Sequence, residues 1–338
     1  MGMIESNAEG EINKCVHCGF CLESCPTYVI TRSEVHSPRG RIMEVKLNLK
    51  SDGINTCMYC RRCEMVCPSG VIYSRIITSA RKPDVFKKIM LKTLEKPKLL
   101  YVATKGIMKG NGEFSLRIRE FIKEVNLPLE INEKNANLYV IPGCIMSTYF
   151  QDTVKNVVSF LQRKGFRIKI INGCCGLAHY SEGDVKGGDL SLNELVKDLR
   201  EKEAICLSSN CTAHMKEKGI KVMDLSEFLI KTGTKVNVGE PFVIHYPCHA
   251  HLKGLSIYLE DTIKDKENEM EMEDPSFECG AGGAFFLFNK EISDSVIEEK
   301  NRKVRASKAK VVISTNPSCS LALRKSGLRV VHLGDLLH

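Results

Sequence analysis

Two runs of four cysteines in the first quarter of the chain have the spacing of iron ligands. In each run, two residues separate the first three cysteines, three residues precede the fourth, and a proline follows it, as in CVHCGFCLESCP and CMYCRRCEMVCP. The eight cysteines are Cys15, Cys18, Cys21, Cys25, Cys57, Cys60, Cys63 and Cys67. With this spacing, three thiolates from one loop bind one iron-sulfur cluster, and the fourth thiolate reaches the cluster of the other run. The runs therefore predict two 4Fe-4S clusters.

Crossed ligation divides these cysteines into two predicted sets. One set is Cys15, Cys18, Cys21 and Cys67, and the other is Cys57, Cys60, Cys63 and Cys25. Zinc sites and unligated thiols are the alternatives, but zinc ribbons use separated pairs of cysteines rather than complete runs of four. His17 lies within the first run, where cysteines already saturate the cluster, so we expect it beside the cluster or in solvent. The basic residues Arg39, Arg41, Arg61 and Arg62 either offset the charge of the clusters or lie on the surface.

The second half of the chain repeats a different cysteine pattern. NLYVIPGC, which ends at Cys144, matches PFVIHYPC, which ends at Cys248. A Cys-Gly pair follows 31 residues later in both copies (144 to 175 and 248 to 279), at Cys175 and Cys279. The third matching element contains Cys211 in the first copy and Cys319 in the second. Repetition of a whole pattern indicates a duplicated structural unit.

The two copies differ at one candidate ligand. The first copy offers Cys144, Cys174, Cys175 and Cys211. The second offers Cys248, Cys279 and Cys319, with Glu278 where the first copy has Cys174. Because a carboxylate is a harder ligand than a thiolate, it is a poorer match for an iron-sulfur cluster. We therefore expect a third cluster in the first copy, and a metal in the second copy stays an open alternative.

Several other residues near these cysteines could take part in chemistry. Cys206 lies in a strand-like segment, which favours a buried core thiol over a ligand. His245, His249 and His251 surround Cys248, so a mixed histidine and cysteine metal site is one interpretation. Histidines that form hydrogen bonds at the mouth of a pocket are the other interpretation, and the one we favour.

The elements that position the cysteines indicate an α+β protein. We expect a mainly helical, ferredoxin-like domain with two clusters at 1–80 and a helical connecting segment at 81–135. The first cysteine-rich unit follows at 136–235 and the second, degenerate unit at 236–338. In the first unit an apolar strand, the helical DTVKNVVSFLQRKG and the strand FRIKII follow one another. This order predicts duplicated α/β units with ligands at the ends of strands, where sites in open α/β sheets form.

Composition limits the partners and the compartment. The 338 residues include 16 cysteines, and 49 Lys and Arg against 41 Asp and Glu give a net charge of +8. Two clusters with their thiolates each carry about −2, which brings the sum to about +4, so the basic balance does not indicate a nucleic-acid partner. The sequence has no apolar stretch long enough to span a membrane and no secretory signal. We expect a cytoplasmic protein, held if at all at the inner face of the membrane through a partner.

With these motifs the chain resembles the iron-sulfur subunits of glycolate oxidase and of lactate-utilisation complexes, and the cysteine-rich subunit of heterodisulfide reductase. The resemblance rests on the two cysteine runs, the SPRGR segment between them, and the two units with their Cys-Gly pairs. It implies transfer of electrons from a flavoprotein subunit, which oxidises a 2-hydroxy acid, to a quinone or a membrane cytochrome b. The chain itself carries no flavin or nicotinamide fingerprint, as that division of labour requires.

The resemblance leaves two other functions open. A relative of the reductase type would use the first cysteine-rich unit to reduce a disulfide, and the protein would then be the catalytic subunit. A redox scaffold or sensor would use its clusters for stability, because binding of a metal can supply folding free energy. An electron-transfer subunit of an oxidoreductase complex is the hypothesis that we favour.

Overall fold

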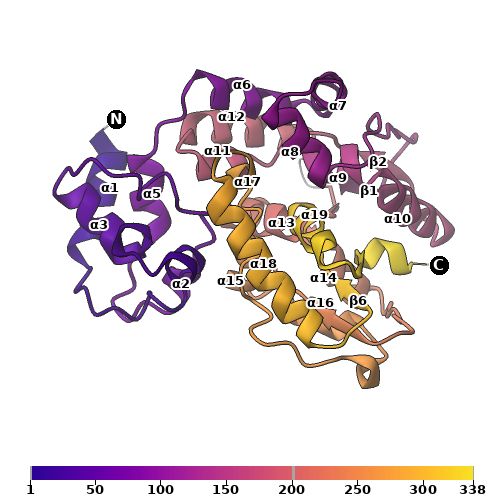
Figure 1. Ribbon diagram of the computed structural model, residues 1–338. Helices are drawn as coiled ribbons and strands as arrows, with labels where there is room; N and C mark the ends of the chain where they lie inside the picture. Colours follow the sequence, from indigo (N-terminus) through magenta and orange to yellow (C-terminus); the bar gives the residue numbers. More distant parts are fainter. Residues whose placement is uncertain (1, 200–201, 338) are drawn as a thin grey trace.

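The computed structural model describes residues 2–199 and 202–337 (Figure 1). It confirms the predicted α+β class, with a helical N-terminal part followed by two small parallel sheets. The predicted boundaries at 80, 135 and 235 fall between elements, after α5, α8 and α14 respectively. That the segments between these boundaries are separate domains stays a prediction.

The N-terminal part consists of short helices around the two cysteine runs. Its helices are α1 (Gly2–Asn13), α2 (Pro26–Thr31), η1 (Glu34–His36), α3 (Pro38–Lys46), α4 (Arg62–Met65) and α5 (Tyr73–Ala80). Pro26 and Pro38 each occupy the first turn of a helix, where the missing N–H of proline costs nothing. The hydroxyl of Ser37 caps α3 by accepting a hydrogen bond from the backbone N–H of Gly40. Ile76 and Ile77 of α5 are fully buried and pack among the cysteines, so the loops that carry the thiols rest on this helix.

Three helices fill the segment between the N-terminal part and the first sheet. They are α6 (Val85–Glu95), α7 (Pro97–Met108) and α8 (Glu113–Phe121). In Figure 1 they lie along the top of the molecule, and α7 packs against α9 of the first cysteine-rich unit. The ring of Phe121 lies 4.7 Å from the ring of Phe286, measured between centroids, so α8 also touches the second unit. The segment therefore covers both units as well as connecting them to the N-terminal part.

The first cysteine-rich unit, which we call copy one, contains a four-stranded parallel sheet in the order β2-β1-β3-β4. Its strands are β1 (Leu138–Ile141), β2 (Ile168–Ile170), β3 (Ala204–Cys206) and β4 (Met223–Asp224). Its helices are α9 (Cys144–Tyr149), α10 (Gln151–Arg163), α11 (Leu177–Ser181), α12 (Val185–Val196), α13 (Ser209–Glu217) and α14 (Leu225–Lys231). The predicted helix and strand of DTVKNVVSFLQRKG and FRIKII are α10 and β2.

The second unit, copy two, has a three-stranded parallel sheet in the order β5-β6-β7. Its strands are β5 (Phe242–Ile244), β6 (Val311–Ile313) and β7 (Arg329–Val331). Its helices are α15 (Cys248–Leu252), α16 (Ser256–Thr262), η2 (Lys266–Asn268), α17 (Phe285–Phe288), α18 (Lys290–Ala306), α19 (Pro317–Leu323), η3 (Arg324–Ser326) and η4 (Leu333–Leu336). Where copy one has β2, copy two has only a single bridge between Phe242 and Glu269.

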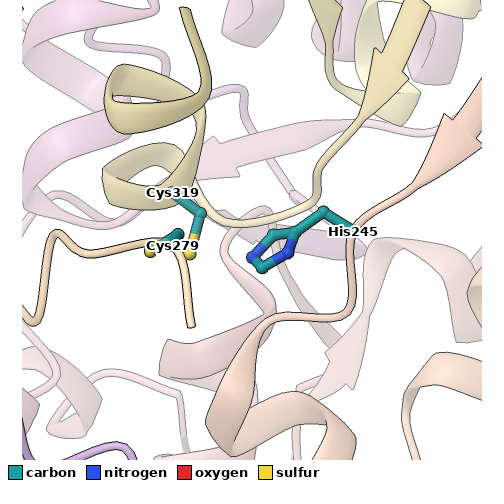
Figure 2. A group of neighbouring side chains, drawn as sticks. All are labelled: His245, Cys279 and Cys319. Atoms are coloured by element: carbon teal, nitrogen blue, oxygen red, sulfur yellow. The ribbon is translucent and has the colours of Figure 1, made fainter. Parts of the chain in front are cut away.

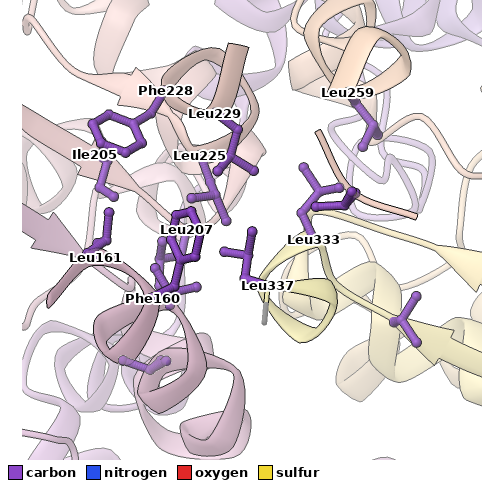
Figure 3. Close-up of a cluster of buried hydrophobic side chains, with 14 of the residues drawn as sticks. Phe160, Leu161, Ile205, Leu207, Leu225, Phe228, Leu229, Leu259, Leu333 and Leu337 are labelled. Carbon is purple, nitrogen blue, oxygen red and sulfur yellow. The ribbon is translucent and has the colours of Figure 1, made fainter. Parts of the chain in front are cut away.

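The two copies share one apolar core. Figure 3 shows side chains from α10, β3 and α14 of copy one close to Leu259, Leu333 and Leu337 of copy two. Burial of each such leucine stabilises the fold by roughly 1.5–3 kcal/mol. Because all strands are parallel and the cysteines follow the strands, this packing brings the ligand-bearing loops of both copies to neighbouring edges.

Candidate metal centres

The first predicted cysteine set lines a single cavity at the outer end of the N-terminal part. The cysteines that line it include all four members of that set, Cys15, Cys18, Cys21 and Cys67. The loop turns tightly around this cavity, because His17 and Gly19 have positive φ values of 55° and 87°. Arg39 holds the loop by donating a hydrogen bond to the backbone oxygen of His17 over 3.2 Å. Cys18 is exposed, so this site lies nearest to solvent.

The second predicted set lines an adjacent cavity. It comprises Cys25, Cys57, Cys60 and Cys63. Cys63 borders both cavities, and the two sites are therefore neighbours. Arg41 is fully buried here, and its Nη1 lies 3.8 Å from the Sγ of Cys25. Of the four arginines considered above, Arg41 thus donates to a predicted ligand, and its positive charge favours a negatively charged cluster at this site.

The donor chemistry of both cavities fits the predicted clusters. Each is lined by the full crossed set of four soft thiols, as iron-sulfur clusters require. Burial raises the pKa of Cys21 to about 11, whereas a ligand must be a thiolate. Binding of a metal would thus release protons from these cysteines. The ligand assignment itself stays a prediction.

The loop of the second run docks onto both cysteine-rich units. The Nε2 of His249 donates a hydrogen bond to the backbone oxygen of Tyr59 over 2.8 Å. Arg61 forms an ion pair with Glu217 of copy one at 2.7 Å, and Arg62 forms one with Asp274 of copy two at 2.8 Å. Sequence patterns gave no sign of these partners, which lie more than 150 residues apart along the chain. The two arginines therefore bind the N-terminal part to the rest of the molecule.

The cysteines of both copies face one large cavity, of ≈ 1500 Å³ including its open mouth. The predicted ligands that line it are Cys144, Cys174, Cys175, Cys211, Cys248, Cys279 and Cys319. The cavity is also lined by apolar side chains of α6, α7 and α8, which are Leu94, Leu100, Ile107, Phe114 and Ile118. The segment predicted to be a connection thus forms part of the site.

In copy one, the thiols of the predicted ligands are neighbours in a row. Cys174 lies beside Cys144 and Cys175, and Cys211 lies beside Cys175 and Cys206. Interaction with the thiols of Cys144 and Cys175 lowers the pKa of Cys174 well below its usual value. The structure thus brings together all four predicted ligands of this copy. All four thiols line the large cavity, and four thiols are the number that a cluster of several irons requires.

Cys206, predicted to be a core thiol, is fully buried on β3. It packs among Ile141, Leu192 and Met215, and its Sγ donates to the backbone oxygen of Ser208 over 3.5 Å. Its thiol also contacts that of Cys211, at the border of the predicted ligand set. That it is not itself a ligand stays a prediction.

The glycine of each Cys-Gly pair is required by a nearby helix. Gly176 has a φ of 86°, and a Cβ atom there would lie 2.3 Å from the backbone oxygen of Gly188 in α12. Gly280 has a φ of 88°, and a Cβ atom there would lie 2.3 Å from the Cγ1 of Ile297 in α18. Only glycine fits both the left-handed backbone and the close approach of the helix. The repeated glycines therefore serve packing next to the cysteines.

In copy two the predicted cysteines are divided. Cys279 and Cys319 are hydrogen-bonded to one another, whereas Cys248 accepts a hydrogen bond from the Nδ2 of Asn210 over 3.6 Å. Burial raises the pKa of the Glu278 carboxyl group. The carboxyl group also lies near the thiols of Cys60 and Cys248. Glu278 thus lies between the second N-terminal site and copy two.

The three histidines of copy two differ in their contacts. His249 donates to the N-terminal loop, and His251 shares a hydrogen bond with Ser256 and stacks on Tyr246. These two histidines have hydrogen bonds, as the favoured interpretation expected. His245 is completely buried and has no hydrogen-bond partner among the described residues, contrary to that interpretation.

Comparisons with known protein families match the N-terminal part and the two cysteine-rich units separately. A family described as a 4Fe-4S dicluster domain matches residues 11–71, and a family described as a cysteine-rich domain matches residues 138–215 and 242–324. These matches support iron-sulfur clusters as the cofactors.

Similar proteins have been named in several bacteria. The probable glycolate oxidase iron-sulfur subunit of Bacillus subtilis (strain 168) is 26% identical, over 97% of this chain and 94% of the relative. The glycolate oxidase iron-sulfur subunit of Escherichia coli (strain K12) is 23% identical, over 95% and 91%. The lactate utilization protein A of Oceanobacillus iheyensis is 25% identical, over 58% of this chain and 93% of the relative. The described part of the chain contains no helix with the length and apolar character that a bilayer span requires.

Proposed function

Because the chain belongs to the family of iron-sulfur subunits that join a dicluster domain to two cysteine-rich domains, we propose that it transfers electrons for a flavin-linked 2-hydroxyacid dehydrogenase. The names of the relatives support glycolate or lactate as the substrate of the complex. A separate flavoprotein subunit would oxidise the hydroxy acid, since this chain has no flavin fingerprint of its own.

The observation that carries this proposal is that each set of cysteines lies next to the following set in space. The first cavity includes the exposed Cys18 and shares Cys63 with the second cavity. In the second cavity, Cys60 lies near Glu278, which lines the large cavity of the two copies. The sets thus lead from the surface of the N-terminal part to the interior of the cysteine-rich units.

We infer two 4Fe-4S clusters in the N-terminal part and a third cluster in copy one. When bound, they supply one-electron redox chemistry. Neighbouring arginines position these sites. Arg41 donates a hydrogen bond to Cys25, and the ion pairs of Arg61 and Arg62 hold the second cysteine run against the two copies. Three four-iron clusters predict about twelve irons per chain, and about eight would limit clusters to the N-terminal part.

The large cavity suits an apolar acceptor such as a quinone. Apolar side chains of α6, α7 and α8 line this cavity together with the thiols of copy one. Ligand sites of this kind are concave and mainly apolar with a few polar groups. We propose that the acceptor enters here, with the complex held at the membrane surface through a partner such as a cytochrome b.

Purification of the complex from its source under anaerobic conditions tests this function. We expect a flavoprotein to accompany the chain, and glycolate or lactate to bleach the iron-sulfur absorbance and to reduce a short-chain quinone. Cys60→Ser should abolish reduction of the quinone. Cys206→Ser is the matched control and should retain it, because this thiol lies in the core.

Other outcomes would contradict the proposal. If no flavoprotein accompanies the chain and the protein instead reduces a disulfide with an artificial electron donor, it is a reductase of the heterodisulfide type. If Cys60→Ser leaves transfer from hydroxy acid to quinone intact, the second site is not part of the path.

A further inference from the structure

Three donor side chains converge in copy two: two cysteines of the repeated motif, and one histidine that the motif does not include. His245 directly follows β5, Cys279 lies in the loop before α17, and Cys319 belongs to α19. Figure 2 shows the imidazole ring of His245 facing the sulfur atoms, and one ligand atom of each residue lies within 4.8 Å of the other two. The three side chains are 0%, 2% and 2% exposed. Among the described residues this is the one group of three such donors that converge so closely.

Buried polar atoms around this point have no hydrogen-bond partners. Both ring nitrogens of His245 are without one, as is the Oε2 of Glu278. A buried polar group without a partner costs about 1–3 kcal/mol, so native proteins rarely keep several together. The carbonyl of Pro275, close to the ring, already accepts from the Nζ of Lys300 over 2.8 Å and from the N–H of Tyr246 over 3.2 Å. Coordination of one cation would satisfy one ring nitrogen of His245 and the orphaned oxygen of Glu278 together.

The spacing of the donors fits a single ion. Zinc binds sulfur at about 2.3 Å and nitrogen at about 2.0–2.1 Å, so tetrahedral donors lie roughly 3.3–3.8 Å apart. Donors within 4.8 Å reach this spacing with small rotations of the side chains. In copy one, by contrast, the thiols of Cys144, Cys174, Cys175 and Cys211 lie in a row and do not converge in this way. The two copies are therefore built for different cofactors.

The donor types select the metal. Two thiols and an imidazole are the usual ligands of Zn²⁺, and a carboxylate can complete the tetrahedron. Glu278 precedes Cys279 in the chain, and its Oε1 lies 3.8 Å from the Sγ of Cys279. Its carboxylate lies outside the group of three, so a rotation of the side chain would bring it to the ion. A carboxylate is a poor ligand for an iron-sulfur cluster and an acceptable one for zinc.

We propose that copy two holds a single zinc ion through His245, Cys279 and Cys319, with Glu278 as the fourth ligand. The ion ties the end of β5 to the loop before α17 and to α19, and it does not change its oxidation state. Copy two thereby acts as a rigid support for the cavity that it shares with copy one. This site does not depend on the identity of the substrate or of the acceptor.

Metal analysis of the anaerobically purified full-length chain tests the site. We expect about one zinc per chain in addition to the iron. X-ray absorption at the zinc edge should give two sulfur ligands at about 2.3 Å and nitrogen or oxygen ligands at about 2.0–2.2 Å. Because it uses the unaltered protein, this measurement does not depend on whether a variant folds.

Three variants sharpen the test. His245→Gln should lower the zinc content at least tenfold and leave the iron content unchanged, whereas His251→Gln is the matched control and should keep the zinc. Cys248→Ser should also keep the zinc, because its thiol lies outside the converging group. Absence of zinc from the native chain, a zinc content equal in His245→Gln and the control, or iron in this site would each overturn the proposal.

Discussion

Glu217→Gln should weaken the docking of the N-terminal part without changing the shape of the side chain. The carboxylate pairs with Arg61, which is 8% exposed, and with Lys253. Burial by itself would raise the pKa of Glu217, but the hydrogen bond and the charge of Arg61 outweigh it, and the pKa falls from 4.5 to about 2. A pKa lower by about 2.5 corresponds to about 3.4 kcal/mol of folding free energy. Since the carboxylate is 32% exposed and solvent screens it, we expect about 1.5–2.5 kcal/mol.

Thermal unfolding of the cluster-bearing chain at pH 7 measures this effect. A loss of about 1.5–2.5 kcal/mol should lower the unfolding temperature by about 3–5 °C. Glu23→Gln is the matched control, because Glu23 pairs with Arg32 on the surface, where the two side chains are 72% and 60% exposed. Such a pair contributes about 0–1 kcal/mol, so the control should shift the unfolding temperature by at most about 2 °C.

The stabilisation by Glu217 should decrease as the pH falls. Because folding lowers the pKa of Glu217, its stabilisation is fully present above about pH 4.5 and is lost as the pH falls towards about 2. The difference between Glu217→Gln and the unaltered chain should therefore be constant from pH 6 to pH 8. Equal shifts in the variant and in Glu23→Gln, or a difference that changes between pH 6 and pH 8, would refute the reasoning.

Three further predictions concern the cysteine sites. Cys67→Ser should remove the same cluster as Cys18→Ser, with a loss of about four irons in each, and EPR spectra that show different clusters missing would contradict crossed ligation. Arg41→Gln should destabilise the chain by about 3–5 kcal/mol, because Arg41 is buried. It should also make the reduction potential of the adjacent cluster more negative in a redox titration. An unchanged potential would show that the charge of Arg41 does not influence this cluster. Cys206→Ser should leave the iron content of the chain unchanged, and a loss of iron would make this residue a ligand.

The spacing of the cysteines was enough to predict where the sites lie. The spacing of each run suggested which thiols could meet, and the members of each predicted set line one cavity, while the ligand assignment stays a prediction. An apolar segment precedes both Cys144 and Cys248, so the sequence predicted that each cysteine follows a strand, and the strands are β1 and β5. These features depend on neighbours along the chain, which the sequence displays directly.

Other features depend on contacts between distant segments, and the sequence did not reveal them. Arg61 and Glu217 lie 156 residues apart, and both belong to charged stretches of ordinary composition. The apolar faces of α6, α7 and α8 were visible as periodic patterns, but a pattern does not state which surface it covers. His245 and His251 stand six positions apart, and only the folded chain shows that His251 has a hydrogen bond and His245 none.

The difference between the two copies follows from where the N-terminal part docks. Tyr59 and Arg62 of the second run both contact copy two, and Cys60 between them approaches the carboxyl group of Glu278. A cysteine at position 278 would complete the thiol set of copy two and would place a further cluster beside the second N-terminal site. The carboxylate instead leaves copy two with a convergent set of hard and soft donors, suited to an ion without redox chemistry. Such an ion holds the docking surface rigid, while the path from the second site to copy one stays within the shared cavity.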